Sequence, residues 1–281
     1  CSEDGSLTCG YSSFRGKRVS MEDYCDLKST KIDGHTVNLF GIFDGLVFFP
    51  VISISKCLEY EMSLSQRQIG VAGHGGSHAA EYLKEHLFEN LMRHPQFMSD
   101  TKLAISETYK KTDSDFLAAE SNTSRDDGST AVLIGKNLYV ASVGDSHAVI
   151  SKTGKAIPLS DDHKPNRSDE RKRIEDAGGV VTWTGTWRAG GILAMARAFG
   201  NRVLNQFVVA EPVFLARQVV DEELASDGLW DVAANEVKIL PLSSIQLLDD
   251  FCLAHPTLAD NITCIVVRFH HDKLDVHGKN K

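Results

Sequence analysis

The chain has 281 residues and an apolar fraction of 42%, enough for one large hydrophobic core or two small ones. Its formal net charge of −8 disfavours a general nucleic-acid-binding protein, because such proteins are normally basic. The longest apolar run, residues 46–54, is too short to span a membrane and contains a proline. We therefore expect neither nucleic acid nor a membrane as a partner.

The six cysteines are scattered along the chain, and none forms a C-x-x-C pair. This dispersal is typical of free or buried thiols in a reducing compartment rather than of a disulfide framework or a zinc site. We therefore expect a cytoplasmic or nuclear protein. The chain begins with Cys1 instead of Met and has no signal peptide, so we expect it to be incomplete at that end. The sequence carries no signal of oligomeric state.

The first half of the chain predicts one strand and two helices. Residues 37–43 form an apolar run that ends at Asp44-Gly45, which predicts a strand running into a turn. Residues 77–94 have the leucine spacing of a helix, with Ser77 as its N-cap and a proline after its end. A second helix is expected over about residues 100–120.

The second half predicts mostly strands. Residues 130–134, 138–143 and 147–151 are separated by short glycine-containing turns, which predicts a hairpin meander. A short helix is expected over residues 168–177, before Gly178-Gly179, and residues 262–269 read as a β-branched strand. Antiparallel strands with helices outside them favour the α+β class, with sheets packed on each other or under helices.

Four acidic motifs set an Asp beside Gly or Asn at or near the mouth of an apolar strand. Their central residues are Asp44, Asp145, Asp227 and Asp260. Any one of them alone is typical of an ordinary turn. Four carboxylates gathered at one sheet edge would repel one another unless hard divalent cations neutralised them. A set of oxygen ligands without thiolate favours magnesium or manganese over zinc.

The string over residues 10–18, followed by Met21-Glu22-Asp23, resembles the opening motif of the protein phosphatase 2C family. The motifs that continue the resemblance in the family's order are Gly41-Ile42-Phe43-Asp44-Gly45, Gly128-Ser129-Thr130-Ala131, Val143-Gly144-Asp145-Ser146, Arg197-Ala198-Phe199-Gly200, Ser226-Asp227-Gly228-Leu229-Trp230-Asp231 and Asp260-Asn261. Residues 163–179 are similar to the plant branch. The resemblance covers most of the chain between about residues 10 and 270.

This resemblance implies a single domain over residues 1–281, built as a two-layer antiparallel β-sandwich flanked by helices (α-β-β-α). It implies a binuclear Mg²⁺ or Mn²⁺ site and a weaker third ion. Asp44, the Gly45 carbonyl, Asp227 and Asp260 would hold the two ions, Glu22 and Asp23 their waters, and Asp145 and Asp231 the third ion. Arg18 would bind the substrate phosphate, and His74 would protonate the leaving oxygen.

The implied activity is hydrolysis of phosphoserine and phosphothreonine in phosphorylated proteins by metal-activated water, as in signalling enzymes. One departure from the family pattern weakens that expectation. The family's contiguous Asp-Gly-His-Gly-Gly is split here, because residues 46–73 separate Asp44-Gly45 from His74-Gly75-Gly76. The insert either loops outward from pinned ends or is translated intron or a gene-model error, and exact restoration of the motif on its removal favours the second origin.

A second departure lies downstream. Residues 221–224 read Asp-Glu-Glu-Leu where the family has a strongly apolar strand, and charged side chains suit a buried strand poorly. Residues 237–258 also differ from the family. Asp227 and Asp231 would then be misplaced, which leaves two rival interpretations open. The chain would be a catalytically impaired phosphatase-like binding protein or a mis-spliced product, or it would fail to fold stably.

Three other features have ordinary interpretations. Trp183 and Trp187, with Arg188, fit either a substrate flap or packing. The basic run over residues 167–173 alternates with acids and favours a solvated helix face. The three histidines of the first helix are spaced too widely to chelate a metal; they are His78, His86 and His94.

Overall fold

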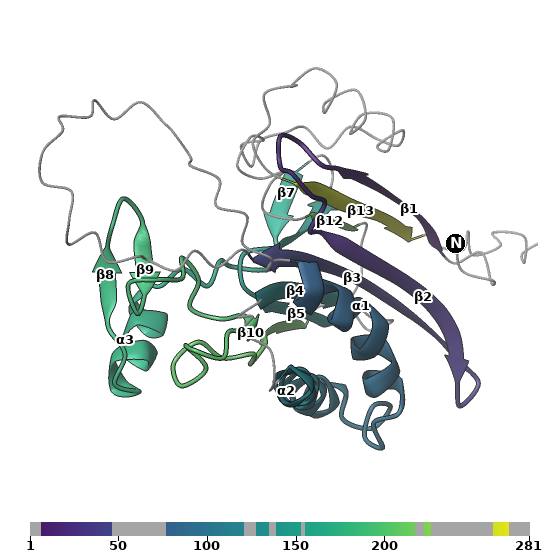
Figure 1. Cartoon of the computed structure of the whole chain (residues 1–281). Coiled ribbons are helices and arrows are strands. Elements are labelled where there is room, and N and C mark those ends of the chain that lie inside the picture. The colour runs from purple at the N-terminus through teal and green to yellow at the C-terminus, as the bar shows by residue number, and fades with distance from the viewer. Residues whose placement is uncertain are drawn as a thin grey trace, which may run out of the picture.

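The computed structural model describes residues 7–46, 77–120, 128–134, 139–152, 155–216, 222–225 and 261–269. In these residues two antiparallel sheets lie face to face, and two helices cover the outer face of one sheet (Figure 1). The α+β class and the two-layer antiparallel sandwich predicted from the sequence are confirmed. The helical layer seen in the described residues lies on one side of the sandwich, over the sheet that contains β3.

The helix-covered sheet has the strand order β11-β5-β4-β3-β2, and a short strand, β10, pairs with β4. Its strands are β2 (Tyr24–Ile32), β3 (His35–Leu46), β4 (Gly128–Ile134), β5 (Tyr139–Val143), β10 (Phe199–Gly200) and β11 (Val213–Ala216). The second sheet has the order β1-β13-β12-β6-β7. Its strands are β1 (Leu7–Phe14), β6 (His147–Lys152), β7 (Lys155–Pro158), β12 (Glu222–Ala225) and β13 (Ile262–Phe269).

Strand β3 shows why the sandwich forms here. Leu39 and Phe43 belong to the cluster packed under the helices, whereas Phe40 and Ile42 alternate with them and are also buried. Because successive side chains of a strand point to opposite faces, the second pair faces the other sheet. A strand with both faces covered reads as the continuous apolar run seen in the sequence. The same alternation puts Asp44 on the side of Phe40 and Ile42.

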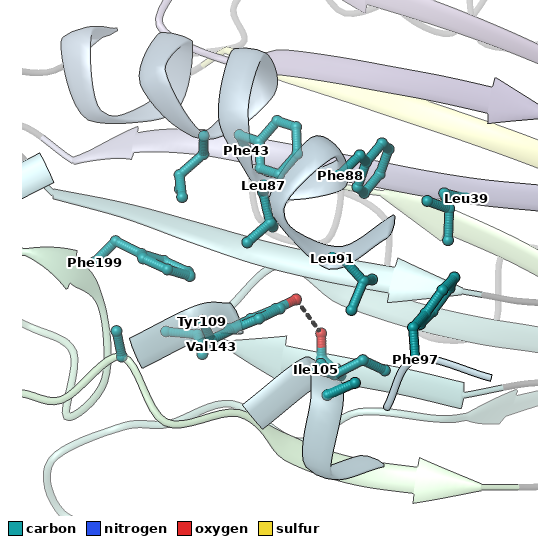
Figure 2. Close-up of a cluster of buried hydrophobic side chains, with 14 of the residues drawn as sticks. Leu39, Phe43, Leu87, Phe88, Leu91, Phe97, Ile105, Tyr109, Val143 and Phe199 are labelled. Carbon is teal, nitrogen blue, oxygen red and sulfur yellow. Dashed lines mark hydrogen bonds between the residues drawn. The ribbon is translucent and has the colours of Figure 1, made fainter. Parts of the chain in front are cut away.

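The two helices are α1 (Ser77–Met92) and α2 (Thr101–Ala119). Figure 2 shows their apolar faces meeting the sheet around Phe43, Leu87 and Tyr109. Gly41 of β3 is required by this packing, since an added Cβ would lie 2.8 Å from the Phe43 ring and 2.9 Å from the Phe88 ring. Neither these helices nor any other helix in the described residues is long and apolar enough to cross a membrane.

A third unit, which we call the α3 unit, lies beside the sandwich and consists of residues 161–198 and 201–209; β10, between these stretches, belongs to the helix-covered sheet. It contains α3 (Ser168–Asp176) and a hairpin of β8 (Val181–Trp183) and β9 (Trp187–Ala189). A small apolar cluster of its own, which includes Ile174 and Leu204, fills the space between helix and hairpin. Figure 1 shows this unit at the end of the sandwich, away from α1 and α2.

The boundaries of most predicted elements are confirmed, but three predictions are wrong. The third strand of the predicted meander, β6, does not pair with β5; it lies in the other sheet between β12 and β7. Asp44-Gly45 is not a turn, because β4 extends far enough to pair with β3 through Leu46. Ser77 is the first residue of α1 rather than its N-cap.

The charged stretch before Asp227 also differs from expectation. Residues 222–225 form strand β12, which pairs with β13 on one side and β6 on the other. The backbone ladder on both sides therefore outweighs the poor strand propensity of two glutamates. The prediction that this stretch cannot serve as a strand is wrong.

Candidate metal and phosphate site

The register of the helix-covered sheet aligns one residue from each of four strands in a row. Tyr24 pairs with Phe43, Phe43 with Ala131, and Ala131 with Val143. Acidic residues lie directly beyond this row. Asp23 precedes Tyr24, Asp44 follows Phe43, and Asp145 comes two residues after Val143. The register thus brings these carboxylates, which are far apart in sequence, to one edge of the sheet.

Two connections bring the edge of the second sheet to the same place. Only Gly144, Asp145 and Ser146 join the end of β5 in one sheet to the start of β6 in the other. In addition, the Glu22 backbone N–H donates to the Asn261 Oδ1 at 2.7 Å, which ties the start of β2 to the start of β13. The two sheets therefore meet at the edge that carries Asp23, Asp44 and Asp145.

The carboxylates at this edge offer only oxygen donors, and their side chains are largely buried. Asp44 is 7% exposed, Asp23 is 6% exposed and Asp145 is 2% exposed. Withdrawing several ionised carboxylates from water is unfavourable unless positive charge lies close by. At Asp145 a cation is present, since the Lys164 ammonium lies 2.5 Å from its Oδ2. An all-oxygen donor set of this kind matches the ligand preference of Mg²⁺ and Mn²⁺.

Arg18 lies in the loop between β1 and β2, beside this edge. Its Nη1 is 3.9 Å from the Oε2 of Glu22, and its side chain is 38% exposed. The loop is fixed by Asn261, whose Nδ2 donates to the carbonyls of Arg15 and Ser20 at 2.8 and 3.1 Å. Arg18 therefore presents a permanent positive charge to solvent next to the carboxylates, where a phosphate could reach it.

The remaining predicted site residues lie outside the described residues, as does most of the insert at 46–73. These site residues are His74, Asp227, Asp231 and Asp260. Two described strands come close to three of these residues in sequence. Strand β12 ends at Ala225, shortly before Asp227 and Asp231, and β13 begins at Ile262, shortly after Asp260. Within the described residues, no group of three or more His, Cys, Asp or Glu side chains is arranged to hold a metal ion. The ligand roles of Asp44 and Gly45 therefore stay predictions.

Sequence reasoning missed the segment that holds Asp145 in place. The His163 backbone N–H donates to the Gly144 carbonyl at 3.0 Å, and the ring Nδ1 lies 3.1 Å from the Gly144 nitrogen. Burial lowers the pKa of His163 to about 4, so the ring is neutral at physiological pH. The resemblance of His163-Lys164-Pro165 to the plant branch marked this segment but gave it no role.

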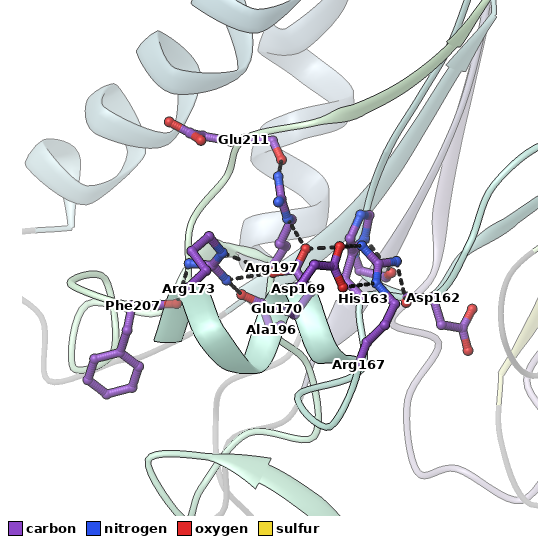
Figure 3. Close-up of polar contacts among 11 residues, drawn as sticks. Asp162, His163, Arg167, Asp169, Glu170, Arg173, Ala196, Arg197, Phe207 and Glu211 are labelled. Carbon is purple, nitrogen blue, oxygen red and sulfur yellow. Dashed lines mark hydrogen bonds and ion pairs between the residues drawn. The ribbon is translucent and has the colours of Figure 1, made fainter. Parts of the chain in front are cut away.

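Glu170 is the second feature that the sequence did not reveal. Its carboxylate is fully buried and accepts from Arg197 Nε at 2.6 Å, Arg173 Nε at 2.9 Å and Arg167 Nη2 at 3.3 Å (Figure 3). The predicted solvated face for residues 167–173 is therefore wrong for these arginines, although Arg171 and Lys172 are exposed. A fully buried carboxylate requires such charged partners, which is why the arginines turn inward.

The arginines around Glu170 also bind backbone carbonyls of neighbouring segments, two of them within the α3 unit and one just beyond it. Arg173 donates to the Phe207 carbonyl at 2.8 Å and to the Ala196 carbonyl at 2.6 Å, and Arg197 to the Glu211 carbonyl at 2.7 Å. The Ala196 N–H in turn donates to the His163 carbonyl at 2.7 Å. A chain of hydrogen bonds thus runs from Glu170 to the segment that holds Asp145.

The tryptophans and histidines occupy ordinary structural positions. Trp183 is 61% exposed at the hairpin tip and stacks edge-on against Trp187, with ring centroids 5.4 Å apart. The histidines of α1 bind neighbouring groups separately. His78 faces Glu120 at 3.4 Å, His86 stacks on Tyr82, and His94 contacts Glu107 at 2.9 Å.

Comparisons with known proteins show which family the chain belongs to. The family model for protein phosphatase 2C matches residues 56–239. A rice protein (Oryza sativa subsp. japonica) named probable protein phosphatase 2C 52 is 61% identical over 98% of this chain and 53% of its own length. Another rice protein, probable protein phosphatase 2C member 13, mitochondrial, is 58% identical over 97% of this chain and 71% of its own length.

A solved structure agrees with the fold. The serine-threonine phosphatase 2C from Toxoplasma gondii superposes with a TM-score of 0.73 at 20% identity, over 95% of this chain and 96% of that one. The sandwich and the matches together define a protein of the phosphatase 2C class. The chain belongs to the protein phosphatase 2C family, and its high-identity relatives are plant proteins. It spans about half the length of the first rice relative.

Proposed function

We propose that this chain hydrolyses phosphoserine and phosphothreonine in phosphorylated proteins. The observation that carries the proposal is the shared edge of the two sheets. Asp23, Asp44 and Asp145 are buried there, and Arg18 lies in the adjoining loop with its side chain 38% exposed. Buried carboxylates next to an exposed arginine suit a dianionic substrate that is bound together with divalent cations.

Asp44 and the Gly45 carbonyl would hold two Mg²⁺ or Mn²⁺ ions together with Asp227 and Asp260, and Glu22 and Asp23 would orient the ions' waters. Asp145 and Asp231 would hold a third, weaker ion. Bound ions of this kind supply a nucleophile at neutral pH and neutralise charge on the phosphoryl group. Arg18 would bind the phosphoryl oxygens through its planar fork, and His74 would donate a proton to the leaving serine or threonine oxygen.

Hydrolysis of a phosphothreonine peptide by the purified chain in Mn²⁺ tests this proposal. Activity should need the metal and should fall by about 100-fold or more in Asp44→Asn, because an ion ligand is lost. Asp33→Asn is the matched control, since Asp33 lies in the exposed turn between β2 and β3 with φ 50°, a conformation that Asn tolerates. Equal activity of the wild type and Asp44→Asn would overturn the proposal.

The insert can be tested in the same assay. A version that lacks residues 46–73 restores the contiguous Asp44-Gly45-His74 motif. Activity in this version alone would mean that the insert disables a sound site. Activity in both would mean that His74 reaches the leaving group despite the insert. Nothing in the described residues or the comparisons supports the rival interpretation of a binding protein without activity.

We also propose that the chain acts in the cytoplasm, the nucleus or both, and binds neither nucleic acid nor membranes. Among the described residues, Cys25 is a free thiol. Burial raises the pKa of Cys25 to about 11, so this thiol stays protonated and unreactive. Fractionation of cells that express the full-length protein would test the location, and recovery with mitochondria would contradict it.

A further inference from the structure

Three consecutive residues lie against the turn that carries Asp145; they are Asp162, His163 and Lys164. The middle one, His163, binds both the nitrogen and the carbonyl oxygen of Gly144, with its ring Nδ1 2.9 Å from that oxygen. Ala196 fixes the segment from behind through its hydrogen bond to the His163 carbonyl. Figure 3 shows Asp162 and His163 beside Arg167, at the start of α3. The backbone of Lys164 is therefore placed firmly next to Asp145.

Lys164 uses this position to contact Asp145. Its Nζ lies 2.5 Å from the Asp145 Oδ2 and 3.7 Å from the Asp162 Oδ2. The Asp145 side chain is 3% exposed, whereas that of Lys164 is 43% exposed. A buried carboxylate needs a cation close by, and the ammonium supplies it here. Since the lysine stem is flexible and the ammonium hydrates strongly, Lys164 can move into water at little cost once another cation arrives.

We propose that Lys164 is the internal counter-ion of Asp145 and that a divalent cation must displace it to bind there. This inference rests on the proposed function, which gives Asp145 a role in metal binding. The ammonium and the cation compete for the same buried oxygens, and two cations held together repel each other. Lys164 thereby keeps the carboxylate stable without metal and sets a low affinity at this position.

Mn²⁺ binding to the full chain, followed by electron paramagnetic resonance of the free ion, tests the proposal. Asp145→Asn first identifies which class of Mn²⁺ sites depends on Asp145. Lys164→Met keeps the length of the stem and removes the charge. It should tighten that class by about tenfold or more at low ionic strength, because a unit charge at contact distance is removed. Lys164→Arg keeps the charge and should leave the affinity within about twofold of the wild type.

Lys172→Met is the matched control, because Lys172 is exposed on α3. This substitution should leave the affinity of every class of Mn²⁺ sites unchanged. Lys164→Met should also have no effect on Mn²⁺ binding when Asp145→Asn is present. If Lys164→Met leaves the Asp145-dependent class unchanged or weakens it, the proposal is wrong. If the wild type binds Mn²⁺ only in classes independent of Asp145, the proposal is also wrong, while the proposed function stands. A wild type that binds no Mn²⁺ would overturn both.

Thermal unfolding without metal gives a readout independent of binding. Lys164→Met should lower the melting temperature in EDTA, because the buried Asp145 carboxylate loses the ammonium 2.5 Å from its Oδ2. Saturating Mn²⁺ should raise the melting temperature of Lys164→Met by more than it raises that of the wild type. A melting temperature in EDTA equal to that of the wild type would show that Lys164 does not stabilise the carboxylate and would overturn the proposal.

Discussion

The sandwich and the α3 unit are held together in different ways. Under α1 and α2 the cluster is apolar, and the hydroxyl of its buried tyrosine, Tyr109, donates to the Ala141 carbonyl at 3.2 Å. In the α3 unit a much smaller apolar cluster is combined with a buried carboxylate, Glu170, and three arginines. A small unit with short strands cannot bury enough apolar area to fix its position. Directional ion pairs around Glu170 instead hold α3 against the other segments of the unit.

The largest expected effect follows from breaking this ion cluster. Glu170→Ala should lower the free energy of unfolding by about 3–5 kcal/mol, because three arginines lose a buried partner. Urea unfolding followed by tryptophan fluorescence would measure it, since Trp183 and Trp187 lie in the α3 unit. Two transitions in place of one would indicate that the α3 unit has separated from the sandwich.

The control for this change lies on the same helix. Glu175 pairs with Arg171 at 2.8 Å, but its side chain is 48% exposed. Glu175→Ala should therefore change stability by less than about 0.5 kcal/mol, as is usual for surface ion pairs. Equal losses of stability in Glu170→Ala and Glu175→Ala would show that the buried ion cluster of Glu170 contributes no more than the exposed pair of Glu175.

The sandwich should respond to lost volume rather than lost charge. Leu87 of α1 is fully buried in the apolar cluster, and Leu87→Ala should cost about 2–4 kcal/mol through lost transfer energy and the cavity left behind. Leu103→Ala is the control, because Leu103 is 38% exposed on α2 and should lose less than about 1 kcal/mol. Urea midpoints by circular dichroism would compare them, and similar losses would argue against tight packing under α1.

One carboxylate in the sandwich is expected to be destabilising at neutral pH. Asp113 of α2 accepts from the Gly200 N–H at 2.7 Å, and burial raises the pKa of its carboxyl to about 6. The folded state therefore keeps a proton that the unfolded state releases above its ordinary pKa of 3.8. Stability falls as the pH rises through the window from 3.8 to about 6, and the loss persists at pH 7.

Asp113→Asn removes this penalty and retains an oxygen for the Gly200 N–H. It should stabilise the protein by about 1–2 kcal/mol at pH 7.5 and by much less near pH 4. Asp115→Asn on the same helix is the control, because Asp115 is 41% exposed and pairs with Lys111. Urea unfolding at both pH values would decide the matter, and a gain that did not depend on pH would rule out this cause.

The apolar parts of the fold could be predicted from the sequence. Strand β13 has the predicted bounds, and α1, α2 and α3 agree to within about two residues. Their apolar periodicity and terminal signals are local properties of the chain. The change of sheet between β5 and β6 could not be predicted, because strand partners are chosen by packing across the whole sandwich.

The residues of the candidate site were likewise predicted only in part. Asp44 and Asp145 were found because each lies at or near the end of an apolar run, and the register places both next to the same row of paired residues. The partners Lys164 and Asn261 were not predicted, since each contacts a residue far away in sequence. Glu170 looked like any acid in a charged helix. Only its burial distinguishes it from Glu175 of the same helix.

The smallest expected effect concerns the tip of the hairpin in the α3 unit. Trp183 is 61% exposed, whereas Trp187 is partly buried against the small apolar cluster and lies under the Arg171 guanidinium at 5.8 Å. Trp183→Ala should change the free energy of unfolding by less than about 0.5 kcal/mol, as exposed substitutions usually do. Trp187→Ala should cost about 2–3 kcal/mol because it removes buried ring area and the cation–π contact. Circular dichroism in urea would measure both, since tryptophan fluorescence changes with either substitution. Equal losses would show that the exposed ring at the hairpin tip stabilises the unit as much as the partly buried Trp187 ring does.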